Sequence, residues 1–435
     1  MDTDVLILGG GAAGLAAARS LASRSLRTIL LEARDLVGGR VRWETSSRTI
    51  VPMELGAEFI HGPARETMAL LREMGSAAFD TVGESWSFAG GRLERQDGDM
   101  FEAASIIERV RTLPEDVSID AFLRPFEADP STREAATGAR AFVEGFEAAD
   151  TALASARAIA EELRSGVDSS SARPVGGYAP LIEHLHSACA AAGVSLHLST
   201  IVRRVVWRRG EVIVDAHGAG GSRSFRARAA IVTLPAGVLR HSGDDAEVVF
   251  APALPAIKQR ALSKIEMGSV YKVVLRFRTA FWERIDDGRF RDGAFFRTEG
   301  QAFSAFWTQY PLRGDVVVAW VGGPKATALN GSSMDQLVTS ALEGFGHTIG
   351  DAALARAEFE SGFVHDWGSD PFARGAYSYV AVGGADARRV LGSPVDDTLF
   401  FAGEATSTNG QGGTVNGALE TGERAASEAA MALER

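Results

Sequence analysis

Short apolar runs and longer stretches with a helical repeat alternate along the chain and predict an α/β protein. Residues 3–8 form a β-branched and leucine-rich run that stops at glycine, as a buried parallel strand does, and residues 12–24 continue with a helical pattern. A second strand is predicted at 28–31, and a further helix near 64–75. The first three elements make a βαβ unit.

The pattern turns helical between residues 101 and 170. This region holds 14 acidic and 7 basic residues, which carry −7 of the net charge of −11. The acidic surplus is either the solvated face of a helical insert or an acidic wall that attracts a cationic substrate. One amphipathic helix is predicted from apolar side chains that recur at steps of three and four residues: Phe142, Phe146, Ala149, Leu153, Ala156, Ala160 and Leu163.

The remaining elements alternate between strands and helices. They are a helix at 178–192, strands at 194–198, 202–207, 211–216, 229–234, 270–277 and 315–321, a helix at 334–345, a strand at 399–404, and a helix from about 414 to 433. No internal repeat and no low-complexity linker divides the chain, so we expect interleaved domains.

Composition narrows the functional classes. The 435 residues suffice for two or three domains, and the negative net charge argues against nucleic acid, whose binding needs clustered Lys and Arg. The single cysteine, Cys189, excludes an internal disulfide and favours a reducing compartment, so we expect a cytoplasmic protein. The first apolar stretch has no basic leader and is interrupted by glycines, so neither a targeting segment nor a membrane span is expected.

The turn after the first strand carries a dinucleotide-binding pattern. Gly9, Gly11 and Gly14 form G-x-G-x-x-G, in which glycine allows a tight turn and a close approach of backbone to a pyrophosphate. Glu32 follows 18 residues after Gly14, at the end of the second strand, where a carboxylate can bind a ribose diol. The alternative is a glycine-rich turn with a surface glutamate.

A second glycine pair strengthens the first interpretation. Glu32, Ala33 and Arg34 are followed by Gly38-Gly39-Arg40, which can lay Arg40 along a pyrophosphate. With this segment the chain resembles the flavin-containing amine oxidases, the family of monoamine oxidases, polyamine oxidases, L-amino-acid oxidases and lysine-specific histone demethylases. The resemblance extends to Leu55-Gly56-Ala57, similar to the loop beneath the flavin, and to Gly403-Glu404-Ala405 with Thr414-Val415, similar to the C-terminal flavin motif.

The resemblance implies FAD and a fold. We expect a Rossmann-type FAD-binding domain built from 1–75, 196–265 and 366–435, interleaved with an α+β substrate domain from 76–195 and 266–365 that carries the helical insert. Ala376 stands where monoamine oxidases have the cysteine that bonds to FAD, so non-covalent FAD is expected. The residues expected to hold the cofactor are Gly9, Gly11, Ala13, Gly14, Glu32, Arg34, Gly39, Arg40, Gly56, Ala57, Glu58, Val202, Gly403, Glu404, Thr414 and Val415.

The same resemblance implies which residues meet the substrate. Trp367 and Tyr377 match the aromatic residues around flavin and substrate, and Thr414 stands where monoamine oxidases have a second tyrosine. Lys272 matches a lysine that holds a water at the flavin N5; its alternative is an exposed edge-strand residue. His61 matches a histidine of polyamine oxidases, or is a loop histidine satisfied by carbonyls.

Two further residues complete the expected site chemistry. Glu58 is expected to meet a cationic substrate beside the flavin loop, or to face solvent. His365 with Asp366, and His184 with His186, lack further ligands at metal-binding spacing, so no metal site is expected.

The predicted function is oxidation of an amine to an imine, which water hydrolyses, while dioxygen reoxidises FAD and yields hydrogen peroxide. A polyamine or a bulky secondary amine is the favoured substrate, with a monoamine or L-amino-acid oxidase as the alternative. Two other classes stay open: a carbon–carbon dehydrogenase of the same fold, like carotenoid desaturases or protoporphyrinogen oxidases, and a scaffold that keeps FAD without turnover. A homodimer is one alternative for the oligomeric state.

Overall fold

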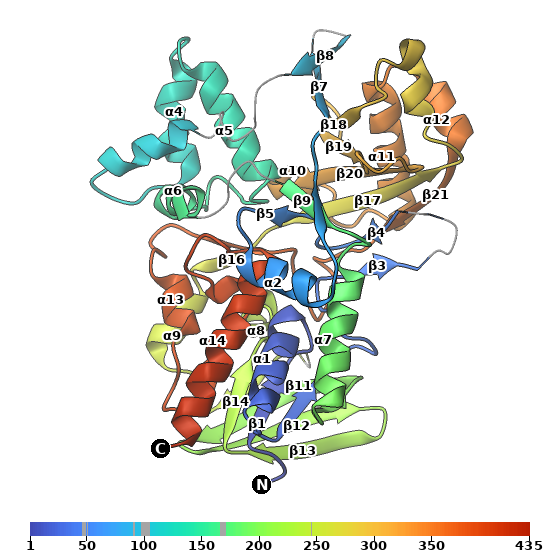
Figure 1. The fold of residues 1–435 in the computed structure, drawn as a ribbon. Coiled ribbons are helices and arrows are strands. Elements are labelled where there is room, and N and C mark those ends of the chain that lie inside the picture. The colour runs from blue at the N-terminus through green and yellow to red at the C-terminus, as the bar shows by residue number, and fades with distance from the viewer. Residues whose placement is uncertain (46–48, 50, 90–91, 97–104, 166–170, 245) are drawn as a thin grey trace.

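The computed structural model describes residues 1–435 except 46–48, 50, 90–91, 97–104, 166–170 and 245. The chain forms a parallel-sheet part, which holds both termini, and a second part built on a mixed sheet with a separate group of helices beside it (Figure 1). Within the described residues, no helix combines the length and the apolar character needed to cross a membrane.

A five-stranded parallel sheet forms the first part. Its strand order is β10 (Ser195–His197), β2 (Thr28–Leu31), β1 (Val5–Leu8), β14 (Ala229–Val232) and β23 (Leu399–Phe401). Every residue of β1 is buried, because α1 (Ala12–Ser23), α7 (Ala179–Ala191) and α14 (Val415–Leu433) cover one face of the sheet. The other face packs against a four-stranded sheet in the order β13 (Gly221–Ala227), β12 (Glu211–Gly218), β11 (Thr200–Arg208) and β15 (Val249–Ala251).

A seven-stranded mixed sheet forms the second part. Its order is β21 (Phe359–Val364), β17 (Val270–Phe277), β20 (Val316–Gly322), β19 (Ala305–Thr308), β18 (Gly293–Thr298), β7 (Glu84–Ala89) and β8 (Arg92–Gln96). Alternate residues of β17 face the two sides, as in any strand. Tyr271 and Val273 pack in the core that α11 (Met334–Thr348) and α12 (Ala352–Glu358) share, whereas Val274 packs in a separate cluster on the opposite side.

The helical insert differs from its prediction. It comprises η1 (Ser105–Thr112), α4 (Ile119–Ala128), α5 (Arg133–Gly145) and α6 (Ala156–Ser165), and the predicted residues 101–104 and 166–170 lie outside the described residues. The single amphipathic helix over 142–163 is wrong, because α5 ends at Gly145 and α6 begins only at Ala156. The stripe is nevertheless mostly buried, since both helices and the turn between them share one core.

The remaining described elements are short. They are β3 (Trp43–Glu44), β4 (Met53–Glu54), β5 (Ile60–His61), α2 (Arg65–Glu73), β6 (Ala78–Asp80), β9 (Ser171–Pro174), α8 (Ala236–Arg240), α9 (Ala256–Leu262), β16 (Ile265–Met267), η2 (Phe281–Gly288), α10 (Gly323–Thr327), β22 (Ser378–Val380), α13 (Ala387–Gly392) and η3 (Glu404–Thr406).

The predicted fold class is confirmed: a parallel α/β sheet lies beside a second, mixed α+β part. The predicted boundary at residue 195 does not follow the packing, because α7 joins the core around α1 and β10 pairs with β2. Of these, α7 comes from the segment 76–195 that was expected to belong to the substrate domain, and β10 crosses the predicted boundary.

Candidate active site

A cavity of about 1810 Å³ lies between the two parts of the molecule. It is lined by the loop after β1, by residues of β17 and β18, and by the start of α14. In open α/β sheets ligands bind outside the carboxyl ends of the parallel strands. The cavity borders this edge, and most of the residues predicted from the sequence meet there.

The loop between β1 and α1 carries the predicted glycines. Gly9 has φ of 112°, which strongly favours glycine. A Cβ on Gly14 would overlap the carbonyl oxygen of Gly9, so only glycine lets α1 approach β1 this closely. A Cβ on Gly11 would have no neighbour closer than 3.8 Å, at Gly39. Gly9, Gly11, Ala13 and Gly39 all line the cavity, so the start of α1 is available to a phosphate group.

Two alanine variants separate packing from ligand binding in this loop. Gly14→Ala is expected to lower the free energy of unfolding of the apo-protein by about 3 kcal/mol or more, because the added methyl overlaps backbone. Gly11→Ala is expected to change it by less than about 1 kcal/mol, since its methyl makes only ordinary van der Waals contacts with Gly38 and Gly39. Chemical denaturation of both apo-proteins checks this; equal losses would contradict the assigned packing.

Glu32 lies at the end of β2 and is buried beside the cavity. Its Oε2 accepts from the Gly10 N–H at 2.7 Å, and its Oε1 accepts from the Arg34 N–H at 2.9 Å. Burial raises the pKa of Glu32, and this effect outweighs the hydrogen bonds, which act to lower the pKa. Each carboxylate oxygen keeps a further lone pair, so the side chain can still accept from a ribose hydroxyl.

Arg34 and Arg40 both line the cavity and both are held by distant acids. Arg34 donates to Asp370 at 2.6 Å. Arg40 donates to Glu404 at 2.8 Å and to the carbonyl of Ala376 at 2.9 Å. The glycine-rich N-terminal segment and the C-terminal motif therefore meet through direct ion pairs.

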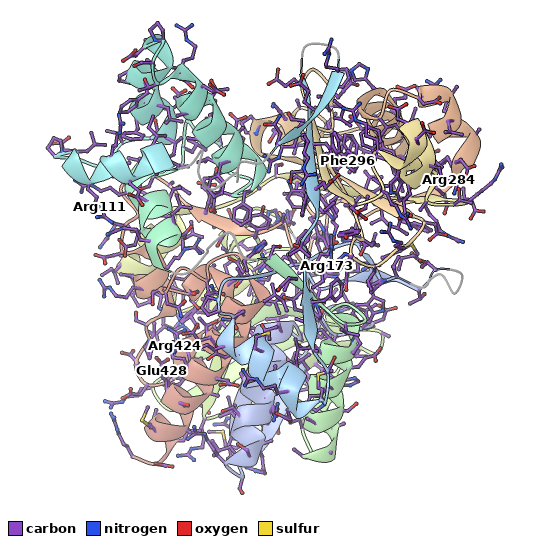
Figure 2. All side chains as sticks on the ribbon, turned by 45° about the horizontal axis from the view of Figure 1, so that its top comes forward. Arg111, Arg173, Arg284, Phe296, Arg424 and Glu428 are labelled. Atoms are coloured by element: carbon purple, nitrogen blue, oxygen red, sulfur yellow. The ribbon has the colours of Figure 1, made fainter. Side chains whose placement is uncertain are left out.

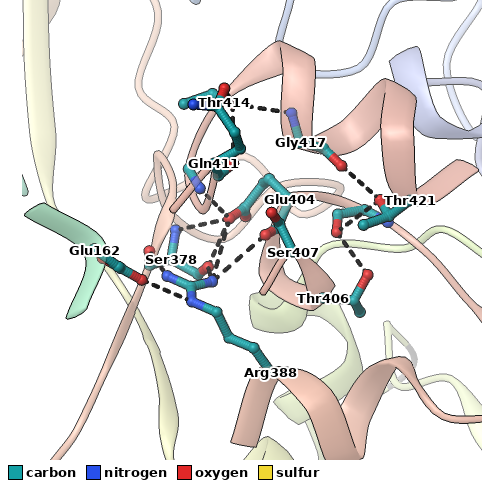
Figure 3. A network of polar contacts seen from close by, with 12 residues as sticks. Glu162, Ser378, Arg388, Glu404, Thr406, Ser407, Gln411, Thr414, Gly417 and Thr421 are labelled. Atoms are coloured by element: carbon teal, nitrogen blue, oxygen red, sulfur yellow. Dashed lines mark hydrogen bonds and ion pairs between the residues drawn. The ribbon is translucent and has the colours of Figure 1, made fainter. Parts of the chain in front are cut away.

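Glu404 is the centre of a buried network (Figure 3). It accepts from the Ser378 hydroxyl at 2.6 Å and from the Gly413 N–H at 3.0 Å, beside Arg388. Burial alone would raise the pKa of Glu404, but the charges of Arg40 and Arg388 outweigh it and lower the pKa. This network fixes the loop of Gly403 and Glu404 at the cavity wall.

The start of α14 is set by its own cap. The Thr414 hydroxyl accepts from the Gly417 N–H at 3.0 Å (Figure 3). Thr414 and Val415 line the cavity, so the positive end of the helix dipole is close to any ligand there.

The predicted loop over 55–57 packs between Arg40 and Trp367. A Cβ on Gly56 would overlap the Arg40 carbonyl oxygen, and the Trp367 indole donates to the Leu55 carbonyl at 3.1 Å. Gly56, Ala57 and Trp367 line the cavity.

Lys272 is buried at the same place. Its strand, β17, lies inside the sheet between β21 and β20, so the alternative of an edge-strand lysine is wrong. Its ammonium donates to the Gly56 carbonyl at 3.1 Å and to Glu58 at 2.7 Å. The ammonium has three N–H donors, and these two protein acceptors use two of them. Because Lys272 lines the cavity, the third N–H is available to a ligand or water there.

Glu58 does not face solvent, which corrects one of its two interpretations. Its side chain is 4 % exposed and ion-pairs with Arg173 at 2.8 Å as well as with Lys272. Arg173 lies where the two parts of the molecule meet (Figure 2). The Trp307 indole donates to both carboxylate oxygens, at 3.0 and 3.1 Å. Because protein groups already bind both oxygens, Glu58 is poorly placed to hold a substrate cation.

Burial alone would raise the pKa of Glu58, but the charges of Lys272 and Arg173 outweigh it and lower the pKa to about 2.

The predicted aromatic wall is assembled from three segments. Tyr377 donates its hydroxyl to the Phe146 carbonyl at 2.5 Å, and burial raises the pKa of Tyr377 well above its usual range. His61 lies in β5 rather than in a loop, and its ring meets the Phe146 ring edge-on at 5.1 Å. Val202 is buried at the start of β11. The cavity is lined by all four of these residues: His61, Phe146, Val202 and Tyr377.

Sequence reasoning missed two acids of the insert. Glu147, in the turn after α5, and Glu162, on α6, line the cavity. Glu162 ion-pairs with Arg388 at 2.9 Å, whereas Glu147 has no hydrogen-bonding or ion-pairing partner among the described residues. Burial and the charge of Glu162 raise the pKa of Glu147 to about 8. The acidic surplus of the region was the available signal, but it could not single out these two residues.

Among the described residues, no three His, Cys, Asp or Glu side chains gather as a metal site.

The chain matches the family described as flavin containing amine oxidoreductase over residues 12–430. It belongs to this family of flavin-containing amine oxidases. It is 31% identical to polyamine oxidase 2 of Arabidopsis thaliana, covering 99% of this chain and 89% of that protein. It is 29% identical to lysine-specific histone demethylase 1 homolog 3 of the same plant, of which it spans 30%.

Solved structures support the fold. Wild-type putrescine oxidase bound to putrescine matches with a TM-score of 0.83 at 23% identity, over 99% of both chains. Cyclohexylamine oxidase from Brevibacterium oxydans matches with a TM-score of 0.81 at 20% identity, over the whole of both chains.

As a member of the flavin-containing amine oxidases, this protein is an FAD-dependent enzyme, and its cavity fits the cofactor. Gly11 lines the cavity without a side chain, which lets a ligand approach the backbone at the start of α1. One continuous cavity borders Glu32, the start of α1, Glu404, Lys272 and the start of α14. An elongated dinucleotide could therefore contact all of these groups.

Proposed function

We propose that this amine oxidase acts on a substrate with a second cationic nitrogen, such as a diamine or polyamine. The observation that carries the proposal is Glu147, whose side chain lines the cavity without a hydrogen-bonding or ion-pairing partner among the described residues. A partly buried carboxylate without a partner is costly, and a substrate ammonium would supply the missing opposite charge. The names of the polyamine oxidase relatives agree with this choice.

The cofactor would lie along the residues expected from the sequence. Glu32 would bind its ribose, the start of α1 and Arg40 its pyrophosphate, and the start of α14 its ring system. FAD, when bound, would supply the two-electron chemistry, as the acceptor of a hydride from the carbon beside the amine nitrogen and the donor of two electrons to dioxygen, which with two protons would become hydrogen peroxide.

The chain's own residues bind and orient the amine. Trp367 and Tyr377 provide an aromatic wall, and Thr414 leaves more room than a second tyrosine would. The apolar surroundings disfavour a charged nitrogen at the reacting end, whereas Glu147 favours one at the distal end. Lys272 would use its remaining N–H to hold a water at the flavin. The imine product would then be hydrolysed by water to an aldehyde or ketone and an amine or ammonia.

Mixing the anaerobic holoprotein with diamines, polyamines, monoamines, amino acids and bulky secondary amines tests the proposal. The flavin absorbance should bleach fastest with a diamine or polyamine, and peroxide should appear when air is admitted. Bleaching by amino acids or benzylamine alone would point to the alternative oxidases. Bound FAD that no amine reduces would point to a scaffold or a carbon–carbon dehydrogenase.

The proposal also assigns FAD binding and amine binding to different segments of the chain. Residues 1–75, 196–265 and 366–435 would hold FAD, joined by α7 and β10, and the rest of 76–195 with 266–365 would hold the amine. The parallel sheet and the cavity lining support this assignment.

A cytoplasmic location is also proposed. Its support is the single cysteine, Cys189, whose thiol pKa burial raises to about 11. Association into a homodimer stays a prediction, which light scattering of the purified protein checks.

FAD is expected to be held without a covalent bond. Ala376 lines the cavity where a cysteine would be needed, and Cys189 packs under α1 instead. Acid precipitation should leave the yellow colour in the supernatant. Colour that stays in the protein pellet would contradict this prediction.

A further inference from the structure

Glu58 is a heavily contacted carboxylate at the cavity wall, and its contacts lead to Lys272. Arg173 and Lys272 bind opposite oxygens, at 2.8 and 2.7 Å, and the Trp307 indole bridges both. Gln309 adds a longer hydrogen bond at 3.4 Å. The carboxylate therefore has no rotational freedom without breaking several charge-assisted bonds.

Arg173 is itself fixed from several sides. It donates to the carbonyls of Thr308 at 3.1 Å and Tyr310 at 3.3 Å, and its guanidinium lies 4.5 Å from the centre of the Phe59 ring. Both carbonyls belong to the end of β19 and the residues after it. Arg173 thus ties Glu58 to the backbone of the mixed sheet.

Lys272 needs such support because its side chain is long. A lysine has several freely rotating bonds, so an ammonium with one carbonyl acceptor would sample many positions. Here Glu58 and the Gly56 carbonyl occupy two of the three donors. The direction of the third N–H is then determined, and it is the donor available to the cavity.

We infer that Glu58, braced by Arg173, is a positioning residue that aims the Lys272 ammonium at the cofactor side of the cavity. This inference rests on the proposed role of Lys272. Glu58 touches neither substrate nor cofactor in this arrangement, so its effect on turnover must pass through Lys272.

A double-mutant cycle tests the inference, with the half-reactions followed separately. Reduction is measured with amine under anaerobic conditions. Reoxidation is measured after dithionite has reduced the FAD, so it needs no amine; dioxygen takes two electrons and two protons and becomes hydrogen peroxide. Glu58→Gln, Lys272→Met and the double variant are compared with the unaltered holoprotein in the half-reaction that Lys272→Met slows.

Glu58→Gln alone is expected to slow that half-reaction at least tenfold. In the Lys272→Met background it should change the rate less than twofold, because the group through which it acts is gone. Equal slowing in both backgrounds would overturn the inference and leave Glu58 a structural residue. If Lys272→Met slows neither half-reaction, the proposed role of Lys272 fails first, and the inference fails with it. If no amine reduces the flavin, the proposed function fails while the reoxidation cycle still tests Glu58.

A second measurement uses the apo-proteins. Titration with FAD should give dissociation constants for Glu58→Gln and the unaltered protein within threefold of each other. A loss of tenfold or more would assign Glu58 to cofactor binding and overturn the positioning role.

Glu58→Gln leaves Arg173 buried without its acid, which can prevent folding. In that case the cycle is run in the Arg173→Gln background, where the added substitution leaves no unpaired guanidinium. Adding Glu58→Gln there should still slow the half-reaction, but by less than in the unaltered protein because the brace is already absent, and no change would overturn the inference.

Discussion

Lys272→Met is expected to slow flavin reduction or reoxidation at least tenfold while FAD stays bound. Methionine fills a similar volume but has no N–H, so nothing at this point of the wall can hold a water. A tenfold loss corresponds to about 1.4 kcal/mol of barrier. Rapid-mixing absorbance measurements of both half-reactions check the prediction.

Lys264→Met is the matched control. Lys264 donates to the Val382 carbonyl at 2.9 Å on the protein surface and does not line the cavity. Its rates should stay within twofold of the unaltered enzyme. Unchanged rates for Lys272→Met would make Lys272 a structural cation that pairs with Glu58 and does no more.

Glu147→Gln is expected to lower kcat/KM for a diamine or polyamine at least tenfold and for benzylamine less than twofold. A hydrogen bond between an ammonium and a buried carboxylate is worth about 1.5–3 kcal/mol, which is roughly a tenfold to hundredfold difference. Benzylamine has no second cation to lose. Steady-state peroxide release at low and high ionic strength measures both, and salt should reduce the diamine value more, because screening acts over about 8 Å at physiological salt.

The pH dependence follows from the raised pKa of Glu147. Burial and the charge of Glu162 move that pKa to about 8, so the group is largely protonated below it and ionised above it. The preference for the diamine over benzylamine should therefore grow as pH rises through about 8, and Glu147→Gln should abolish this growth. Glu144→Gln is the control, since Glu144 lies on α5 but does not line the cavity. Benzylamine as the better substrate would favour the monoamine or amino-acid oxidase alternative.

The sequence predicted those helices and strands that are determined by residues close together in the chain. The strand at 3–8, the helix at 12–24 and the final helix were found within a few residues of β1, α1 and α14, because apolar periodicity and glycine placement determine them. Strands β18 and β19 were missed, since each pairs on its outer side with a strand outside its own segment, β18 with β7, which is distant in sequence, and β19 with β20.

The candidate cofactor residues could be named from the sequence because each motif constrains its own backbone. Gly14 must be glycine where a helix starts against a strand, and that requirement is visible within six residues. What the sequence could not determine is which charges meet. Arg40 pairs with Glu404, 364 positions away, and Arg173 reaches Glu58 across 115.

The sequence by itself thus determined the family, the α/β architecture and the backbone motifs for FAD, since these depend on short-range steric requirements. Only the tertiary structure decided that Glu58 pairs with two cations, whereas Glu147 pairs with none in the part of the chain that the structure describes. Burial and the partner of each carboxyl set its charge, and both depend on how distant segments pack.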